Sequence, residues 1–303
     1  MDCINNYKKN DDSDYIEDDY QRAEIDYERA NKYHYISDCE RVDYNDFYDM
    51  FDIFDINEEN CYDLLNSFTN EQLNNISFYG KNITGKCLGR FIENNPKILQ
   101  NIDLQNVKLL KLEYLENPLG NSTNIKNLNL YNNNLEYQLS SLNKIINKNK
   151  SIEILNISKT EIFNQITFNQ LQDFNKSITN NKTIKTLKMN YIFKNKESVV
   201  DSIFDNGFKN NKSIETLELT DNDIIDCEVI SKSIKNNNNL KKIDLSNNKI
   251  TDYSLENLFK ELKDRKSKLE IDLKYNNDIT HIYFNEIPKY VTLKVNDNIN
   301  VIY

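Results

Sequence analysis

The residues of this chain that come nearest to a catalytic motif lie in one glycine-containing segment, Gly80-Lys81-Asn82-Ile83-Thr84-Gly85-Lys86-Cys87. Its spacing is close to that of a phosphate-binding loop, G-x-x-x-x-G-K-[ST], in which backbone N–H groups surround the phosphates and the last hydroxyl holds Mg²⁺. Cys87 stands where that hydroxyl is needed. Ile83 also falls at a position that a repeated apolar pattern requires for its core. The segment therefore predicts no nucleotide or other cofactor site.

The other residue types that commonly carry catalysis are scarce. His34 and His281 are the only histidines, which leaves little material for a histidine-based metal site or a Ser-His-Asp triad. Paired carboxylates are frequent, but a chain with 48 Asp and Glu residues forms such pairs by chance. Arg90 is expected in a loop, as an exposed arginine. We predict no catalytic residue, no metal site and no enzyme activity.

A repeated apolar pattern organises most of the chain. Two copies of L-x-x-L-x-L-x-x-N-x-L lie about 26 residues apart, at Ile214, Leu217, Leu219, Asn222 and Ile224, and at Leu240, Ile243, Leu245, Asn248 and Ile250. The middle of each copy predicts a short strand, because alternate side chains of a strand point to the same face. The Asn follows the strand, where its side chain can bond to backbone groups of a turn.

This pattern resembles the leucine-rich repeat, and the helix-sized spacer between copies is similar to that of the ribonuclease-inhibitor-like subclass. Further copies begin at Leu73, Leu99, Ile125, Ile152, Ile184, at Ile271 with a register slip of one residue, and as a partial copy at Leu293. The Asn column is broken at Lys81, Val107, Thr160 and Ile192. The resemblance implies an α/β solenoid of about eight repeats plus a partial terminal one, with a curved parallel sheet inside and helices outside.

The spacers between copies have helical periodicity. Apolar residues recur at i, i+3, i+4 and i+7 in two of them, at Leu139, Leu142, Ile145 and Ile146, and at Leu255, Leu258, Phe259 and Leu262. Asn, Lys and Ser follow these helices, so that the Asn-rich run 234–239 is interpreted as a helix exit. Abundant Asn and Lys with scarce Gly and Pro are typical of A+T-rich coding sequences, and the Asn runs receive no functional role.

The charge divides the chain into three parts. Residues 1–60 hold 19 acidic and 6 basic residues, while the rest of the chain has a small excess of basic residues. We expect a disordered acidic tail at 1–14, an acidic helical cap at 15–70 that covers the open end of a solenoid, and the repeat domain at 71–303. A net charge of −10 argues against binding to a nucleic-acid backbone.

Cysteines and hydropathy indicate the compartment. Five scattered cysteines, none in C-x-x-C spacing, and an N-terminus without an apolar segment favour a reducing, cytoplasmic location. No apolar stretch approaches the roughly 18 residues that a membrane span requires, so that no membrane association is expected.

A partner would bind on the concave face that the resemblance implies, where one exposed strand residue per repeat forms a column. Glu218, Asp244 and Asp272 fall in successive repeats of that column, and Asp103 lies in the same column nearer the N-terminus. Tyr79 and Tyr131 belong to the next exposed column, and aromatic residues often carry interface energy. We predict a protein or peptide partner with a basic patch, which meets the acidic row while the tyrosines are buried.

Two other functions are compatible with the sequence. Residues 15–70 can be interpreted as an F-box-like element, which would make the chain a substrate-recruiting adaptor of a ubiquitin ligase. Repeats of this subclass also assist GTPases, a role in which Arg90 would take part. The identity of the partner and the oligomeric state are open at this stage.

Overall fold

In the computed structural model, strands and helices alternate along the residues that the structure describes, which are 68–107, 110–297 and 299–302. The predicted acidic tail 1–14 lies outside these residues, as does the predicted cap 15–70 except for its last three residues. The F-box-like interpretation of 15–70 falls outside them for the same reason.

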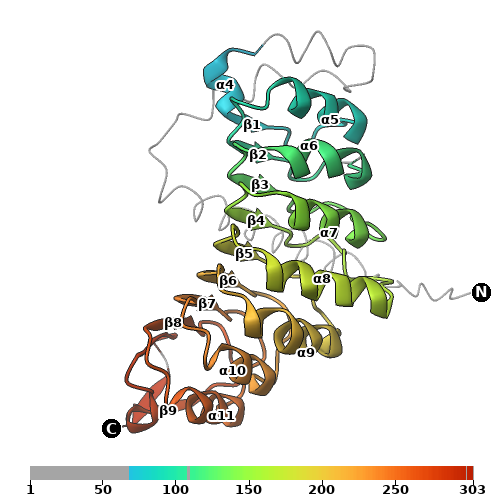
Figure 1. Ribbon diagram of the computed structural model, residues 1–303. Helices are drawn as coiled ribbons and strands as arrows, with labels where there is room; N and C mark the ends of the chain where they lie inside the picture. The colour runs from blue at the N-terminus through green and yellow to red at the C-terminus, as the bar shows by residue number, and fades with distance from the viewer. Residues whose placement is uncertain (1–67, 108–109, 298, 303) are drawn as a thin grey trace, which may run out of the picture. The chain divides into compact units, whose positions relative to one another are not determined.

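Nine short parallel strands form one sheet, in which each repeat adds its strand beside that of the repeat before it (Figure 1). In sheet order the strands are β1 (Asn75–Ser77), β2 (Asn101–Asp103), β3 (Asn127–Asn129), β4 (Ile154–Asn156), β5 (Thr186–Lys188), β6 (Thr216–Glu218), β7 (Lys242–Asp244), β8 (Leu269–Asp272) and β10 (Val291–Lys294). The register is kept through β4, β5 and β6, so that the longer spacings on either side of Ile184 do not interrupt the sheet.

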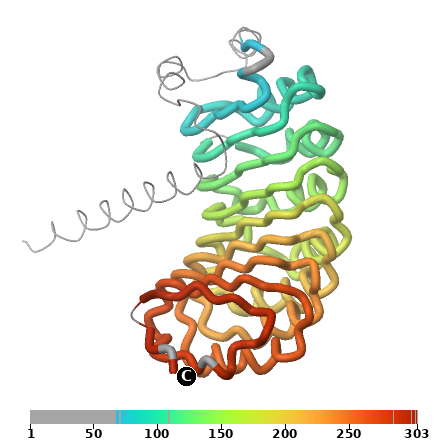
Figure 2. The backbone as a smooth tube through the Cα atoms, turned by 90° about the vertical axis from the view of Figure 1, so that its left-hand side faces the viewer, coloured from blue at the N-terminus to red at the C-terminus, as the bar shows by residue number. Residues whose placement is uncertain are grey.

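Helices α5 to α11 lie on one side of this sheet, and each repeat makes one coil of the backbone (Figures 1 and 2). The helical segments of the described residues are α4 (Asn70–Asn74), α5 (Gly85–Asn94), η1 (Leu112–Leu115), α6 (Glu116–Asn121), α7 (Leu139–Lys148), α8 (Phe168–Asn180), α9 (Glu197–Asn206), η2 (Phe208–Asn210), α10 (Glu228–Ile234), α11 (Asp252–Leu262) and η3 (Phe284–Glu286). Threonine side chains cap several of them, and Thr167 forms a capping box with Gln170 at the start of α8.

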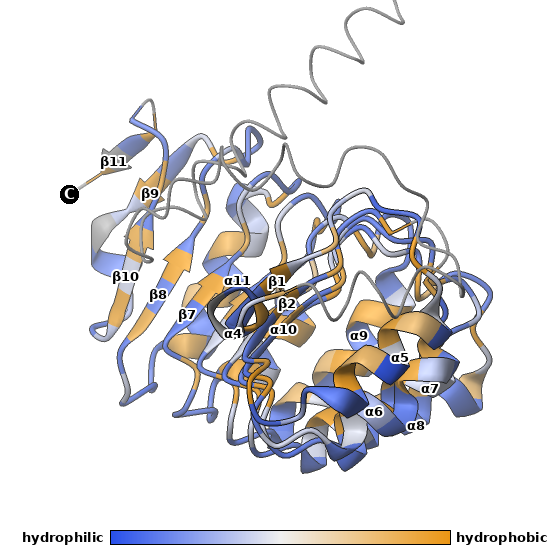
Figure 3. Ribbon diagram, turned by 90° about the horizontal axis from the view of Figure 1, so that it is seen from above, coloured by the Kyte–Doolittle hydropathy of each residue, from blue (hydrophilic) through white to orange (hydrophobic). Residues whose placement is uncertain are grey.

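The hydrophobic core lies between the sheet and the helices (Figure 3). The apolar rows predicted in the spacers face it, since α7 buries Leu142 and Ile145, and α11 buries Leu258 and Phe259. The core residues at the centres of the strands pair across the sheet, as Leu217 does with Ile243. One short strand and one helix cannot enclose such a core alone, and the stacking of repeats completes it.

A first ladder of buried asparagines follows the strands, as the sequence predicts. The Asn248 side chain donates to the carbonyls of Leu219 (3.0 Å) and Leu245 (2.9 Å). Its Oδ1 accepts from the backbone N–H groups of Asn222 (2.9 Å) and Ile224 (3.1 Å) in the preceding repeat. Asn133, Asn222 and Asn276 make equivalent bonds. The buried asparagine therefore provides hydrogen-bond partners for backbone N–H and C=O groups of the turns that would otherwise be unpaired in the core.

Breaks in the predicted Asn column are compensated locally. The N–H of Val107 donates to Oδ1 of Asn133 in the next repeat, at 2.8 Å. Thr160 bonds through its own hydroxyl to the carbonyl of Ile157, at 2.7 Å. The bond of Val107 uses only its backbone, and the N–H of Asn222 donates to Asn248 in the same way, so that an apolar residue in the column keeps this bond.

The one-residue slip predicted for the copy at Ile271 is confirmed, and it lies after the strand of that copy. Ile271 pairs directly with Ile243, and Asn276 occupies the ladder position, with its Oδ1 3.0 Å from the N–H of Ile250. The sheet keeps its register because a one-residue slip would turn core side chains to the solvent. The extra residue lies in the loop between Asn276 and Ile279, so that Ile279 reaches the core one position later than Ile250 does in its repeat.

A second ladder of buried asparagines lies at the ends of the helices, where the sequence predicts only helix exits. The Asn211 side chain donates to the carbonyls of Ile178 (2.7 Å) and Asn181 (3.4 Å). Its Oδ1 accepts from the N–H groups of Ser213 (3.0 Å) and Ile214 (2.8 Å). Equivalent residues are Asn149, Asn181 and Asn237. These asparagines are structural whatever the coding bias that favours them.

Arg265 takes the place of asparagine in the next rung of the second ladder. It is 3 % exposed, and its guanidinium donates to the carbonyls of Ile234 (2.5 Å), Leu240 (2.7 Å) and Ser267 (3.0 Å). Ile234 is the last residue of α10, so that the cation lies at the negative end of a helix dipole. Burial lowers the pKa of the Arg265 side chain.

A small second sheet follows β8. Strands β9 (His281–Tyr283) and β11 (Asn300–Ile302) pair in parallel. His281 connects this sheet to α11, because its Nδ1 lies 3.1 Å from Oδ2 of Asp252. The hydroxyl of Thr280 donates to the same oxygen at 2.6 Å. His281 thus joins two elements in a packing role.

Candidate partner-binding surface

The outward-facing side chains of β1 to β8 and β10, with the residues that directly follow these strands, form a surface that we call the sheet surface. Each strand buries its central core residue and turns the flanking residues away from the core, as Thr216 and Glu218 flank Leu217 in β6. Adjacent strands lie about 4.8 Å apart, so that equivalent residues of successive repeats become direct neighbours in a column.

The structure brings the three predicted acidic residues into one row. Glu218 lies opposite Asp244, and Asp244 lies opposite Asp272. The row ends in a lysine on each side, because Lys188 pairs with Glu218 and Lys294 with Asp272 in the sheet register. All three carboxylates are half-buried, and like charges side by side on a sheet cost stability.

The lysines offset the ends of the row more than its middle. Lys188 Nζ lies 3.1 Å from Oε1 of Glu218. Lys294 Nζ lies 2.8 Å from Glu270 in the neighbouring column, and this contact together with the nearby Asp272 and Asp244 raises the pKa of Lys294. Within the part of the chain that the structure describes, neither Asp244 nor Asp272 forms an ion pair with a lysine or arginine. The centre of the row is therefore not ion-paired, and only the longer-range attraction of Lys294 offsets its negative charge.

The two predicted aromatic residues lie apart from the acidic row. Tyr79 follows β1 and is 41 % exposed, whereas Tyr131 follows β3 and is half-buried. Strands β4 and β5 separate both from the three acidic residues. The sheet surface thus has an aromatic and amide-rich region at β1–β4 and an acidic region at β6–β8.

Asp103 belongs to a different environment from the acidic row. Ser77 Oγ donates to Oδ2 and Asn129 Nδ2 donates to Oδ1, each at 3.1 Å. The backbone and side chain of Gln105 donate to the same carboxyl at 3.2 and 3.3 Å. Burial raises the pKa of the Asp103 carboxyl although these hydrogen bonds oppose that effect. Its acceptor positions are used inside the protein.

Asp103→Asn is expected to raise the free energy of unfolding at pH 7 by less than about 1 kcal/mol, because it removes a charge whose burial is unfavourable. A raised folded-state pKa means that the folded protein binds the proton more tightly than the unfolded chain does. Asp103 therefore contributes stability as pH falls from above its raised pKa to the usual value of 3.8. The difference in free energy of unfolding between the variant and the wild type should therefore shrink as pH falls over that range, as measured by urea titrations. Asp278→Asn, at an exposed site, serves as the control, and an equal pH trend in both variants would contradict the assignment.

A row of amides that sequence reasoning missed lies on the same surface. The side chain of Asn127 donates to Asn101, and that of Asn101 donates to Asn75. The signal in the sequence is an Asn directly before the strand core residue in three successive repeats. The row makes the β1–β3 part of the sheet surface a polar amide face.

The glycine-containing segment and Arg90 have structural surroundings that differ from a catalytic site. Ile83 is fully buried, as the repeat pattern predicts. Thr84 caps α5, and its Oγ1 accepts from the N–H of Cys87 at 3.2 Å. The loop position expected for Arg90 is wrong, since Arg90 lies on the exposed side of α5. Helical periodicity resumes directly after Ile83 and includes Arg90.

The parallel sheet, the row of helices and the asparagine ladder define a leucine-rich-repeat solenoid. No helix among the described residues has the length and apolar character needed to cross a membrane. Those residues also contain no cluster of three metal-ligating side chains.

Comparisons with known proteins found similar solved structures but no similar family model or curated sequence. No protein-family model matches the chain, and no curated protein sequence shows significant similarity to it. Among solved structures, internalin C2 from Listeria monocytogenes is 18% identical over 75% of this chain and 84% of that one, with a TM-score of 0.41. The leucine-rich repeat-containing protein LegL7 from Legionella pneumophila is 14% identical over 74% and 92%, with a TM-score of 0.45. An internalin, inlF, from Listeria monocytogenes is 16% identical over 78% and 82%, with a TM-score of 0.35.

Proposed function

We propose that this chain is a non-enzymatic, cytoplasmic protein-interaction module that binds a protein or peptide partner on its sheet surface. The observation that carries the proposal is the row of Glu218, Asp244 and Asp272, in which neither Asp244 nor Asp272 forms an ion pair with a lysine or arginine of the described residues. The α-helix that accompanies most strands supports assignment to the ribonuclease-inhibitor-like subclass.

A basic partner is the class that this surface fits best. Placing a cation beside Asp244 and Asp272 would offset the repulsion along the row, and half-buried carboxylates are less screened by solvent than exposed ones. Tyr79 and Tyr131 would add buried aromatic area if the partner extends toward β1. Electrostatic complementarity of this kind sets specificity and association rate more than affinity alone.

The test is affinity purification from the native cell with mass-spectrometric readout, followed by binding measurements on each purified candidate. The triple variant Glu218→Lys, Asp244→Lys, Asp272→Lys is expected to weaken binding of a true partner by about a hundredfold or more. The matched control reverses three exposed acidic residues on the helix side, Glu93→Lys, Asp205→Lys and Glu256→Lys. Equal binding by the wild type and the sheet-surface variant would place function elsewhere on the chain. A Tyr79, Tyr131 double substitution tests the aromatic part separately.

A further inference from the structure

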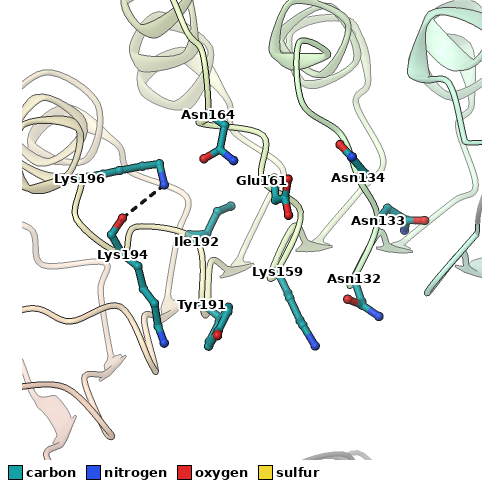
Figure 4. A pocket seen from close by; sticks show the side chains of 10 residues that line it. All are labelled: Asn132, Asn133, Asn134, Lys159, Glu161, Asn164, Tyr191, Ile192, Lys194 and Lys196. Carbon is teal, nitrogen blue, oxygen red and sulfur yellow. Dashed lines mark hydrogen bonds between the residues drawn. The ribbon is translucent and has the colours of Figure 1, made fainter. Parts of the chain in front are cut away.

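A cavity of about 330 Å³ lies outside the acidic row, among the loops that follow β3, β4 and β5. The charged residues that line it are Lys159, Lys194, Lys196 and Glu161. In Figure 4 the ring of Tyr191 lies between the side chains of Lys159 and Lys194, which extend to the same side. The cavity therefore gathers three ammonium groups and one carboxylate around an aromatic ring.

The positions of two lysines are fixed by contacts that do not neutralise them. Lys194 Nζ lies 4.0 Å from the centre of the Tyr191 ring, a cation–π contact. Lys196 Nζ donates to the carbonyl of Lys194 at 3.3 Å (Figure 4). Within the described residues, neither Lys194 nor Lys196 is paired with a carboxylate, and Glu161 is not paired with a base. These three unpaired side chains carry two positive charges and one negative charge, in a chain that is acidic as a whole.

The backbone of the cavity gives a second, independent observation. The residue that follows each strand in the turn has a positive φ in eight successive repeats, at Gly80, Asn106, Asn132, Lys159, Tyr191, Asp221, Asn247 and Tyr275. Gly, Asn and Asp adopt this conformation most readily, because other side chains crowd the backbone there. Lys159, Tyr191 and Tyr275 depart from that preference, and the first two stand in adjacent repeats and line the cavity. Residues retained in an unfavourable backbone conformation often serve a function.

We propose that this cavity binds an acidic peptide segment of a protein partner, with carboxylate side chains beside Lys194 and Lys196 and an apolar contact on Tyr191. The inference rests on the proposed interaction function and adds a second contact of opposite charge. Lysine ammonium groups bind carboxylates as point charges without a fixed planar geometry. The acidic row at β6–β8 and this basic cavity at β3–β5 would orient a partner that carries a basic and an acidic region.

The test uses the full-length chain and a fluorescein-labelled decapeptide of alternating Glu and Ser, with its Gln counterpart as the neutral probe. Fluorescence anisotropy is expected to show binding of the Glu peptide that weakens with salt. Lys194→Gln with Lys196→Gln should weaken it about tenfold or more, because each lysine contributes a charge-assisted bond. The charge-matched control, Lys263→Gln with Lys266→Gln, lies outside the cavity at exposed sites and should leave binding unchanged. Equal weakening by both pairs would overturn the proposal, since it would show general attraction only.

Tyr191→Asn separates function from folding. Asn tolerates the positive φ of 53° at this position, so that the variant should unfold at an equal or higher urea concentration while its affinity for the Glu peptide falls. Tyr275→Asn makes the same change at φ 59° in another repeat and should leave peptide binding as in the wild type. Unchanged binding by Tyr191→Asn would overturn the role of the ring.

Two further arms identify the source of the anion. The first arm uses a peptide with phosphoserine in place of Glu, with inorganic phosphate as competitor. Binding of the phosphorylated peptide alone would overturn the carboxylate assignment. The triple reversal of Glu218, Asp244 and Asp272 should leave Glu-peptide binding equal or stronger. The two proposals can fail separately. If the triple variant loses its partner but the wild type does not bind the Glu peptide, the cavity proposal is contradicted and the proposed function stands.

Discussion

Asn248→Ala is expected to lower the free energy of unfolding by about 3–5 kcal/mol. The two hydrogens of the Asn248 amide are shared among three backbone carbonyls within hydrogen-bond distance, its Oδ1 accepts from two backbone N–H groups, and the residue is only 6 % exposed. Alanine leaves these groups without a partner in a site that is too enclosed for free access of water. Each buried group left unsatisfied costs about 1–3 kcal/mol, and partial relaxation keeps the total below their sum. Urea denaturation followed by circular dichroism measures the loss.

Asn277→Ala is the matched control, because Asn277 lies beside a ladder residue in the next repeat but is exposed. Its free energy of unfolding should stay within about 0.5 kcal/mol of the wild-type value. Hydrogen exchange should accelerate in β6 and β7 of the Asn248 variant, on either side of the lost bonds. A variant as stable as the control would mean that the ladder adds little beyond the apolar core.

Arg265→Met is expected to lower the free energy of unfolding by about 3 kcal/mol. Two effects oppose each other here. Removing a buried cation recovers its desolvation penalty, yet it also leaves the carbonyls of Ile234, Leu240 and Ser267 without their donor. We expect the second effect to be larger, because all three acceptors are backbone oxygens and one ends α10. Methionine keeps most of the apolar volume, so that the measured loss reports on the hydrogen bonds.

Two companion variants make the Arg265 result interpretable. Arg265→Lys keeps the charge but lacks the planar fork that reaches several carbonyls at once, and it should recover only part of the loss. Lys266→Met, at the exposed neighbouring position, should be neutral within about 0.5 kcal/mol. If Arg265→Met were as stable as the wild type, the desolvation cost of the guanidinium would equal the worth of its bonds.

Most of the fold could be predicted because the apolar residues carry it. Leu217 and Leu219 point to the core because alternate strand residues face the same side, and the equivalent residues of the other repeats do the same. The helical spacers bury the residues that periodicity selects. The copy at Ile271 shows the same, since Ile271 and Leu273 keep the spacing of the template and Ile279 alone falls one residue late. Strand pairing accordingly keeps Ile271 opposite Ile243.

The buried polar residues were harder to predict than the apolar ones. Asn211 occurs in the run Asn-Lys-Ser-Ile and Asn181 in Asn-Lys-Thr-Ile, and this recurrence was a usable signal. Abundant surface asparagine concealed it, because composition alone does not distinguish a buried amide from an exposed one. Arg265 breaks the run, and only three-dimensional packing shows that its guanidinium takes the role of the amide.

The candidate sites were predictable to different degrees. The acidic row follows from strand register, so that Glu218, Asp244 and Asp272 could be placed in one column from the sequence. The sequence does not predict which carboxylates form ion pairs with lysines, since Lys294 pairs with Glu270 rather than with Asp272. The basic cavity needs loops of three repeats and side-chain geometry, which no single repeat template contains.

The two asparagine ladders give the array a direction. Asn248 supplies partners to Leu219 and Asn222 of the repeat before it, and Asn211 does the same for Ile178. Support thus flows from the C-terminal neighbour to the N-terminal one, while the sheet itself is shared equally. Damage to one repeat should therefore weaken the buried hydrogen bonds of the preceding repeat more than those of the following repeat.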